Sequence, residues 1–378
     1  MHPVSEPNRG LPEDGLHASR QNELRDRFAG VLLGTALGDA LGLPMEGMHA
    51  SVISRLFPQI NRFNLLGRVG FVSDDTEQSA LLAQSLVQHP HEKANCVRAF
   101  RRALLGWFLR LPWGIGFGTL KACVRIALGF SRSGVSSAGN GAAMRAAILG
   151  AFFFDDERRR REWSDEIANV THRDRRAVDG ATYVAELAAY ALRGNFAGAR
   201  SELVESAAEV VKEPSLRSAI ASAQVLAKCG AEVSIAAREL GNTGFANHTI
   251  ALATFCFLRF GDNPESAIIE TIRAGGDTDS NAAIVGAWVG ALYGEQGLPT
   301  RLMKDLHDGP FGSTHLRALA DDLAQARCGV AKARARFSWP CALMRNLLLW
   351  PVNIVHAFRM FFAGMLLRDR AHPFRRSK

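Results

Sequence analysis

Two short clusters of acids and hydroxyls stand out in this sequence. The first reads SDDTE from Ser73 to Glu77, and the second reads GGDTDS from Gly275 to Ser280. Each cluster directly precedes an apolar stretch rich in small residues. Carboxylates held close together repel one another unless a cation lies between them, and oxygen ligands favour magnesium, manganese or calcium. If the two clusters meet in the fold, the sequence therefore predicts a divalent-metal site.

Each cluster also has a simpler interpretation as the N-cap of a helix. Acids and hydroxyls accept hydrogen bonds from the unpaired N–H groups of a first helical turn, and Glu77 stands where a capping box would place a glutamate. The double glycine before Asp277 weakens this interpretation for the second cluster, because it lets the backbone turn sharply beside a ligand. Two separate clusters of paired acids favour a metal site over two unrelated caps.

A third candidate is the small-residue loop from Ser136 to Arg145, which reads SSAGNGAAMR. A loop of this kind at a helix N-terminus exposes amide donors that suit a phosphate or pyrophosphate. A simple turn, with glycines in the left-handed region, explains the same residues equally well. His172, in the THRD segment, is by itself more typical of a structural or surface histidine.

The elements that must position these residues are helices. Ala- and Leu-rich segments with helical periodicity are separated by short Gly, Asn or Pro breaks, and alternating β-branched runs are almost absent. The predicted helices are 24–37, 79–87, 96–109, 120–128, 143–154, 177–192, 203–211, 216–228, 250–260, 264–273 and 282–293. The sequence therefore predicts an all-α fold and excludes a nucleotide-binding α/β fold.

Two of these segments carry glycine at every fourth position. The first stripe is Gly30, Gly34, Gly38 and Gly42, and the second is Gly286, Gly290 and Gly294. A glycine inside a helix costs about 1 kcal/mol relative to alanine, so a stripe indicates close approach of another backbone. We expect the two striped helices to pack tightly at the centre of the domain, with the acidic clusters at its mouth.

The composition is that of a soluble globular protein, with 47% hydrophobic and 22% charged residues. Its six cysteines form no metal-binding pattern and are expected to be buried in a reducing compartment. Residues 1–20 are polar and contain three prolines, so we predict a disordered lead-in, no signal peptide and a cytoplasmic protein. The helical domain is predicted over 21–330, followed by an extension over 331–378.

The extension holds the excess charge. The whole chain has a net charge of +8, but residues 331–378 contain ten Lys or Arg against one acid, Asp369. The rest keeps 35 basic and 36 acidic residues, so no nucleic-acid partner is predicted. Residues 346–367 are long enough to cross a bilayer, but Asn353, His356 and Arg359 interrupt them. The sequence leaves open whether residues 339–378 lie peripherally on the inner face of a membrane or dock on the core or a partner protein.

Five segments in order resemble the motifs of the ADP-ribosylglycohydrolase family, which includes dinitrogenase reductase-activating glycohydrolases. They are GVLLGTALGDALGLPMEG at 30–47, SDDTEQS at 73–79, GNGAAMR at 139–145, THRD at 171–174 and GGDTDSNAAIVGAWVGALYG at 275–294. The resemblance implies a compact all-α orthogonal bundle with a central two-metal cleft that binds ADP-ribose. The implied cofactors are two divalent cations, Mg²⁺ or Mn²⁺.

The resemblance also implies roles for individual residues. The metal ligands fall on Ser73, Asp74, Asp75, Asp277, Asp279 and Ser280. The substrate contacts fall on Ser137, Asn140, Gly141, His172 and Gly276. Asp75, Asp279 or Glu46 would act as the general base. In the loop 112–116 some relatives carry an acid where this chain has Gly114.

The function expected from this resemblance is metal-dependent hydrolysis of the glycosidic bond between ADP-ribose and an ADP-ribosylated protein side chain or small molecule. Two alternatives remain: an ADP-ribose-binding regulatory or immunity protein with little turnover, and a two-metal nucleotide phosphoesterase. The product separates the two reactions, because only the glycohydrolase releases intact ADP-ribose.

Overall fold

The computed structural model describes residues 13–193, 199–330 and 333–370 of the chain. Within these residues the structure is helical, with isolated β-bridges and no strand, so the predicted all-α class is confirmed. The helices are α1 (Glu13–Gly42), α2 (Ala50–Leu56), α3 (Asp74–Gln88), α4 (Lys93–Phe108), α5 (Phe117–Ala127), α6 (Ala147–Phe152), α7 (Glu157–Asn169), α8 (Arg175–Arg193), α9 (Arg200–Ala208), α10 (Pro214–Lys228), α11 (Val233–Leu240), α12 (Ala246–Phe260), α13 (Pro264–Arg273), α14 (Thr278–Tyr293), α15 (Thr300–Asp305), α16 (Ser313–Arg327) and α17 (Trp339–Arg370). Short 3₁₀ turns occupy η1 (Leu43–Met45), η2 (Asn140–Ala142) and η3 (Glu295–Gly297).

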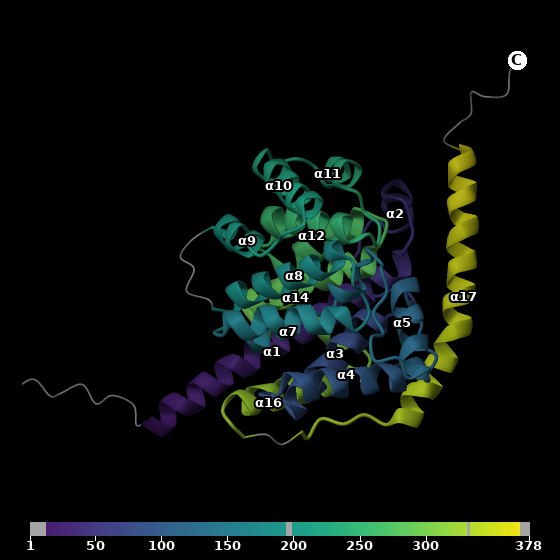
Figure 1. Cartoon of the computed structure of the whole chain (residues 1–378). Coiled ribbons are helices and arrows are strands. Elements are labelled where there is room, and N and C mark those ends of the chain that lie inside the picture. Colours follow the sequence, from purple (N-terminus) through teal and green to yellow (C-terminus); the bar gives the residue numbers. More distant parts are fainter. Residues whose placement is uncertain (1–12, 194–198, 331–332, 371–378) are drawn as a thin grey trace, which may run out of the picture.

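Helices α1 and α14 pack against each other at the centre of the molecule (Figure 1). Their glycine stripes face one another so closely that a Cβ atom built on Gly34 would lie 2.0 Å from the carbonyl oxygen of Gly286. A Cβ on Gly30 would lie 2.2 Å from the carbonyl oxygen of Gly290. The predicted close packing of the two striped helices is therefore confirmed.

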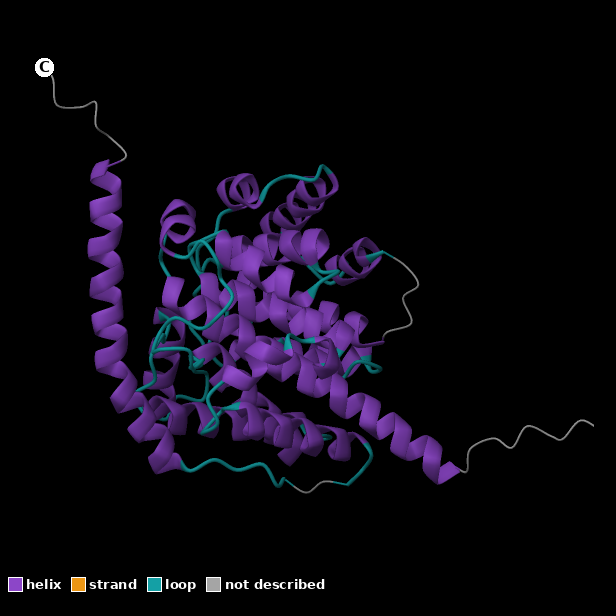
Figure 2. Ribbon diagram, turned by 180° about the vertical axis from the view of Figure 1, so that it is seen from behind, coloured by secondary structure: helices purple, strands orange, loops and turns teal. Residues whose placement is uncertain are grey.

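The remaining helices enclose this pair. Helices α3, α6 and α16 pack on α1, whereas α8, α12 and α13 pack on α14, and buried side chains of both sets form one hydrophobic core. Seen from behind, the described chain consists of helices joined by loops (Figure 2). Residues 19–45 are long and apolar enough to cross a membrane, but the 18-residue apolar window within this stretch is completely buried in the fold. Its hydrophobicity is therefore that of a central core helix.

The N-terminal boundary differs from the prediction. Helix α1 begins at Glu13, so the lead-in expected over 1–20 ends earlier, and residues 1–12 lie outside the described part of the chain.

Helix α17 runs along the outside of the molecule (Figure 1). It docks on the core through polar side chains: Asn346 Nδ2 donates to the Arg110 carbonyl at 2.9 Å, and His356 Nε2 lies 2.7 Å from the Pro44 carbonyl oxygen. Residues 339–360 form the second stretch that is long and apolar enough to span a membrane, but only 22% of the 18-residue apolar window within it is buried. Of the arrangements that the sequence left open, the structure shows α17 docked on the core, with much of the helix surface still exposed.

Candidate metal centre

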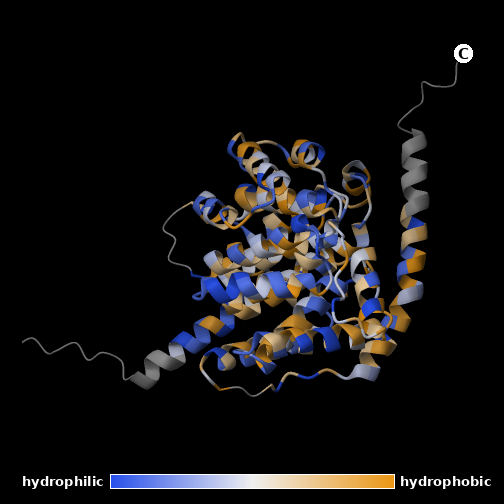
Figure 3. Ribbon diagram, viewed as in Figure 1, coloured by the Kyte–Doolittle hydropathy of each residue, from blue (hydrophilic) through white to orange (hydrophobic). Residues whose placement is uncertain are grey.

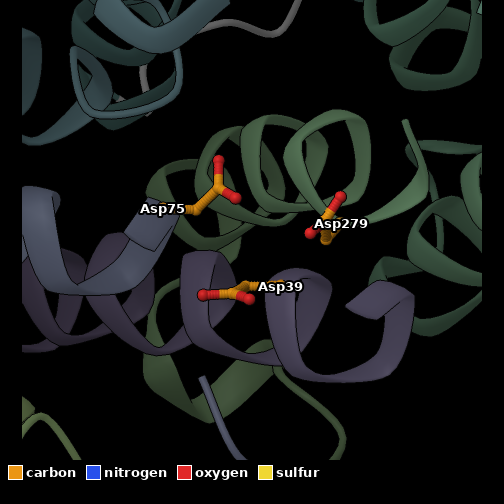
Figure 4. Close-up of side chains that lie close together, drawn as sticks. All are labelled: Asp39, Asp75 and Asp279. Carbon is orange, nitrogen blue, oxygen red and sulfur yellow. The ribbon is translucent and has the colours of Figure 1, made fainter. Parts of the chain in front are cut away.

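Three carboxylates from three helices converge at one end of the central pair. Asp39 comes from α1, Asp75 from the first turn of α3 and Asp279 from the first turn of α14 (Figure 4). One oxygen from each lies within 4.8 Å of the others, and all three side chains are buried. The glycine contact between α1 and α14 brings these positions together, because Gly38 and Gly42 flank Asp39 and pack on the start of α14.

Asp39 caps helix α3 from outside. Its carboxylate accepts hydrogen bonds from the Ser73 N–H at 2.9 Å, the Thr76 N–H at 3.1 Å and the Thr76 hydroxyl at 2.5 Å. Neither Ser73 nor Asp277, which hold the N-cap positions of α3 and α14, makes a side-chain capping bond. The simple capping interpretation is therefore wrong for both positions, and the hydroxyl of Ser73 is left for other partners.

The two acidic clusters are in direct contact, as the sequence required. The Ser280 hydroxyl donates to Asp75 Oδ2 at 3.2 Å, and the Ser73 hydroxyl lies 3.4 Å from the same oxygen. The other oxygen, Asp75 Oδ1, is buried without a hydrogen-bond partner. A buried, unpartnered carboxylate oxygen costs free energy unless a cation contacts it. The hard oxygen donors at this point fit a divalent metal ion.

The electrostatics of the protein alone support this fit. Burial, and then the charges of neighbouring carboxylates, raise the pKa of Asp74, Asp75 and Asp279 well above the usual range. Burial also raises the pKa of Asp39, although four hydrogen bonds oppose the effect. Carboxylates that are buried this close together repel one another, and a divalent cation between them would relieve the repulsion.

Asp74 and Asp277 lie at the edge of the cluster and are held by amide side chains. Asn140 Nδ2 donates to Asp277 Oδ2 at 2.8 Å, and Gln78 Nε2 donates to Asp74 Oδ2 at 3.2 Å. Asp74 also faces Gly114, where a Cβ atom would lie 2.7 Å from Asp74 Oδ1 and where φ is +82°. Both the positive φ angle and the close contact with Asp74 favour glycine at position 114, where some relatives carry an acid.

The predicted substrate residues gather beside His172. The histidine is buried, and Cβ atoms built on Gly118 and Gly141 would lie 2.6 Å from its Nε2 and 2.9 Å from its Cε1. The Ser137 hydroxyl lies against the same Gly118. Because these positions are glycines, the backbone of Gly118 and Gly141 can pack directly against the imidazole ring and the hydroxyl.

A chain of buried hydrogen bonds joins His172 to Asp74 at the edge of the carboxylate cluster. Arg145 donates to Gln78 Oε1 at 2.8 Å and to the Thr171 hydroxyl at 2.6 Å, and that hydroxyl lies 2.8 Å from His172 Nδ1. Burial, followed by the charge of Arg145, lowers the pKa of His172 to about 3, so the ring is neutral. Donation from Thr171 to Nδ1 would leave the proton on Nε2, the ring nitrogen that lies against Gly118.

Glu46 reaches the site through backbone pairing. The Gly47 N–H donates to the Gly276 carbonyl, and the Gly276 N–H donates to the Met48 carbonyl, both at 2.8 Å. Glu46 is open to solvent, yet the surrounding protein and the charges of Asp277 and Asp39 raise its pKa to about 7. Because both backbone groups of Gly276 are used in this pairing, the structure gives it a positioning role, and its predicted contact with substrate stays a prediction.

Sequence reasoning missed three residues of this site: Asp39, Gln78 and Arg145. Each lies inside a motif segment that resembles the family. Asp39 and Arg145 are charged residues in an apolar or small-residue context, whereas Gln78 directly follows the first acidic cluster. The position of Asp39 between the stripe glycines Gly38 and Gly42 could have identified it. An acid at this position becomes buried when the glycine stripe packs against another helix.

The model of the ADP-ribosylglycohydrolase family matches residues 20–332 of the chain. The chain belongs to the ADP-ribosylglycohydrolase family. The resemblance inferred from the five motifs is therefore confirmed.

Curated relatives and a solved structure agree with this assignment. The chain is 26% identical over 314 residues to the ADP-ribosylhydrolase ARH3 of Xenopus tropicalis, covering 72% of this chain and 89% of that protein. It is 27% identical over 317 residues to the ADP-ribosylarginine hydrolase Tri1 of Pseudomonas putida (strain GB-1), covering 79% and 78%. A solved chain described as an ADP-ribosylglycohydrolase-related protein complex superposes with a TM-score of 0.63 at 28% identity, covering 81% of this chain and 99% of that one.

The family membership shows that this ADP-ribosylglycohydrolase is an enzyme that hydrolyses ADP-ribose linkages, as predicted. The buried aspartates are a site that could hold metal. The family match ends at residue 332, so α17 lies outside it.

Proposed function

We propose that this glycohydrolase depends on two divalent cations, Mg²⁺ or Mn²⁺, and releases intact ADP-ribose from a modified protein side chain or a small-molecule acceptor. The proposed ligands are Ser73, Asp74, Asp75, Asp277, Asp279 and Ser280, with Asp39 holding the first cluster in place. When bound, such ions would orient the ribose hydroxyls and lower the pKa of a nearby water molecule.

The observation that carries the proposal is Asp75 Oδ1. It is a buried carboxylate oxygen without a hydrogen-bond partner, and it stands among two other carboxylates whose oxygens lie within 4.8 Å. In a cluster that served only structural hydrogen bonding, a donor would be expected within hydrogen-bond distance of this oxygen.

The substrate would lie between this cluster and His172. The neutral imidazole and the Ser137 hydroxyl lie together against Gly118, and both are groups that suit the phosphates and ribose hydroxyls of ADP-ribose. Asn140, which binds Asp277, would fix the position of the ribose relative to the metal ligands.

We propose Glu46 as the general base. Asp75 and Asp279 are buried within the carboxylate cluster, whereas Glu46 stands at its edge and is open to solvent. Glycoside hydrolysis needs a carboxylate that takes a proton from the attacking water as the bond to the ribose breaks. Glu46 can take that role without giving up a metal ligand.

The test is to incubate the full-length protein with arginine-linked and serine-linked ADP-ribosyl substrates, with Mg²⁺, Mn²⁺ or a chelator. We expect intact ADP-ribose as the product, no turnover in the chelator, and recovery after metal is added back. Asp279→Asn should abolish turnover and weaken Mn²⁺ binding measured by calorimetry, because it removes one of the three converging carboxylates.

Asp321→Asn is the matched control, because Asp321 is an exposed acid on α16 whose side chain pairs with Arg25 in a surface salt bridge. Normal activity in the chelator would contradict the metal requirement. Release of AMP or phosphate would show a phosphoesterase instead, and tight binding of ADP-ribose without turnover on any acceptor would leave a binding protein.

A further inference from the structure

We propose that the outward face of α17 binds the surface of a membrane that contains anionic phospholipids. The proposal concerns the described residues 333–360 and does not depend on the reaction proposed above.

Helix α17 differs from an ordinary surface helix, which turns its large apolar side chains inward and its polar side chains outward. Its buried face carries two amides beside Ala342 and Leu349, and these amides, Asn346 and Asn353, are each 5% exposed. Large apolar side chains of this helix are exposed to solvent, and Figure 3 shows hydrophobic residues along the coloured part of α17. Those on the outer face are Met344, Leu347, Leu348, Ile354, Val355 and Phe358.

The docking contacts keep the apolar face turned outward. Arg345 forms an ion pair with the buried Glu77, the last residue of the first acidic cluster. The indole N–H of Trp339 donates to the Gly106 carbonyl at 3.2 Å, and that of Trp350 donates to the Leu111 carbonyl at 3.0 Å. Rotating the helix to bury its apolar face would break these bonds and leave polar groups of the core unpaired.

Charge identifies the partner. From residue 323 to residue 368 the sequence contains no acid, and the exposed basic residues include Arg334, Arg336 and Arg359. Five further Lys or Arg follow between 361 and 378. A second copy of the chain would bring like charges together, whereas anionic headgroups attract basic residues beside an apolar helix face.

The polar contacts also favour binding at the surface over crossing the bilayer. His356 lies against the Pro44 carbonyl, two residues before Glu46, so the helix is attached beside the catalytic site. A helix that left the core to span the membrane would carry Asn346, Asn353 and His356 into hydrocarbon. The bound face would therefore hold the mouth of the site close to the membrane.

The experiment is flotation of the full-length protein with vesicles of phosphatidylcholine alone or mixed with phosphatidylglycerol. We expect flotation with the mixed vesicles and release by high salt. The double variant Leu348→Glu, Phe358→Glu should lower the bound fraction by about tenfold or more, because it places carboxylates against the anionic surface.

Val225→Glu is the matched control. Val225 is 61% exposed on α10, comparable with Leu348 at 67% and Phe358 at 61%, so all three positions should accept glutamate without loss of thermal stability. Equal flotation of the double variant and the wild type would overturn the proposal. If the wild type does not float, and light scattering shows that it is a dimer whereas the double variant is a monomer, the face would be assigned to a second copy of the chain. Binding that resists high salt and carbonate would indicate a spanning helix.

Discussion

Asp39 shows how one residue can prepare a site without being its most obvious ligand. Asp39, on the neighbouring helix α1, accepts hydrogen bonds from the N–H groups of Ser73 and Thr76. The first turn of α3 therefore does not need the side chains of Ser73 and the following acids as caps. Those side chains are then free to face the cluster. The sequence could not reveal this, because the capping bond joins positions that only tertiary packing brings together.

Gln78 offers a test of the link between the two halves of the pocket. It donates to Asp74 and accepts from Arg145, which holds Thr171 beside His172. Gln78→Met keeps the volume and removes both bonds. We expect kcat/KM for ADP-ribose release to fall about tenfold or more, because a buried charged partner is left unpaired.

The control for this variant is Gln88→Met at the exposed end of the same helix, which should keep full activity. Steady-state kinetics and Mn²⁺ titration would be measured for both. Wild-type kinetics in Gln78→Met would show that the hydrogen-bond chain has no part in catalysis.

At the scale of the elements, the contact between α1 and α14 was predictable and α7 was not. A repeat of glycines every fourth residue has few explanations in a helix other than close packing, so spacing alone predicted the contact. Helix α7 has the sequence ERRRREWSDEIAN, which is too polar to show a clear apolar stripe, although one face of the helix is buried. That face includes Arg160, fully buried and paired with Glu186 on α8 at 2.8 Å, a partnership that no periodicity reveals.

The glycine contact predicts a large effect from a single methyl group. In Gly34→Ala the new Cβ would lie 2.0 Å from the Gly286 carbonyl oxygen, so the two helices must separate. We expect the free energy of unfolding to fall by about 3 kcal/mol or more, measured by chemical denaturation. Turnover should fall with it, because the same contact positions Asp39 and Asp279.

Gly116→Ala is the comparison, since a Cβ at Gly116 meets no atom within 4 Å and its φ is −67°. Its cost should stay below about 1 kcal/mol. Similar stabilities for the two variants would refute the tight-contact explanation of the stripes.

At the scale of the whole molecule, the sequence predicted the fold class and the meeting of two distant clusters, because acids and glycines are costly without a partner. It could not predict which way α17 faces. Amphipathic reasoning places polar residues outward, yet Asn346 and His356 turn inward because carbonyl groups of the core accept their hydrogen bonds.

Buried histidines predict how global stability depends on pH. Burial lowers the pKa of His315 to about 4, below its ordinary value of 6.5, so the unfolded chain binds a proton that the folded protein excludes. The stabilisation is complete above the unfolded pKa and is lost as pH falls. Between pH 7 and pH 5 the loss from His315 should be about 2 kcal/mol.

This contribution is measured by urea unfolding of the wild type and His315→Asn at both pH values. The variant should lose less stability on acidification than the wild type. An equal loss in both proteins would show that His315 is already protonated in the folded state.

The site also depends on completion of the chain. Asp75 and Ser280 touch although 205 residues separate them, and the contact relies on helices from opposite ends of the family domain. Contacts of such long range form late in folding. A nascent chain, or a fragment cut between α3 and α14, holds only half of the oxygen donors, so hydrolysis of ADP-ribose linkages begins only when the last central helix is in place.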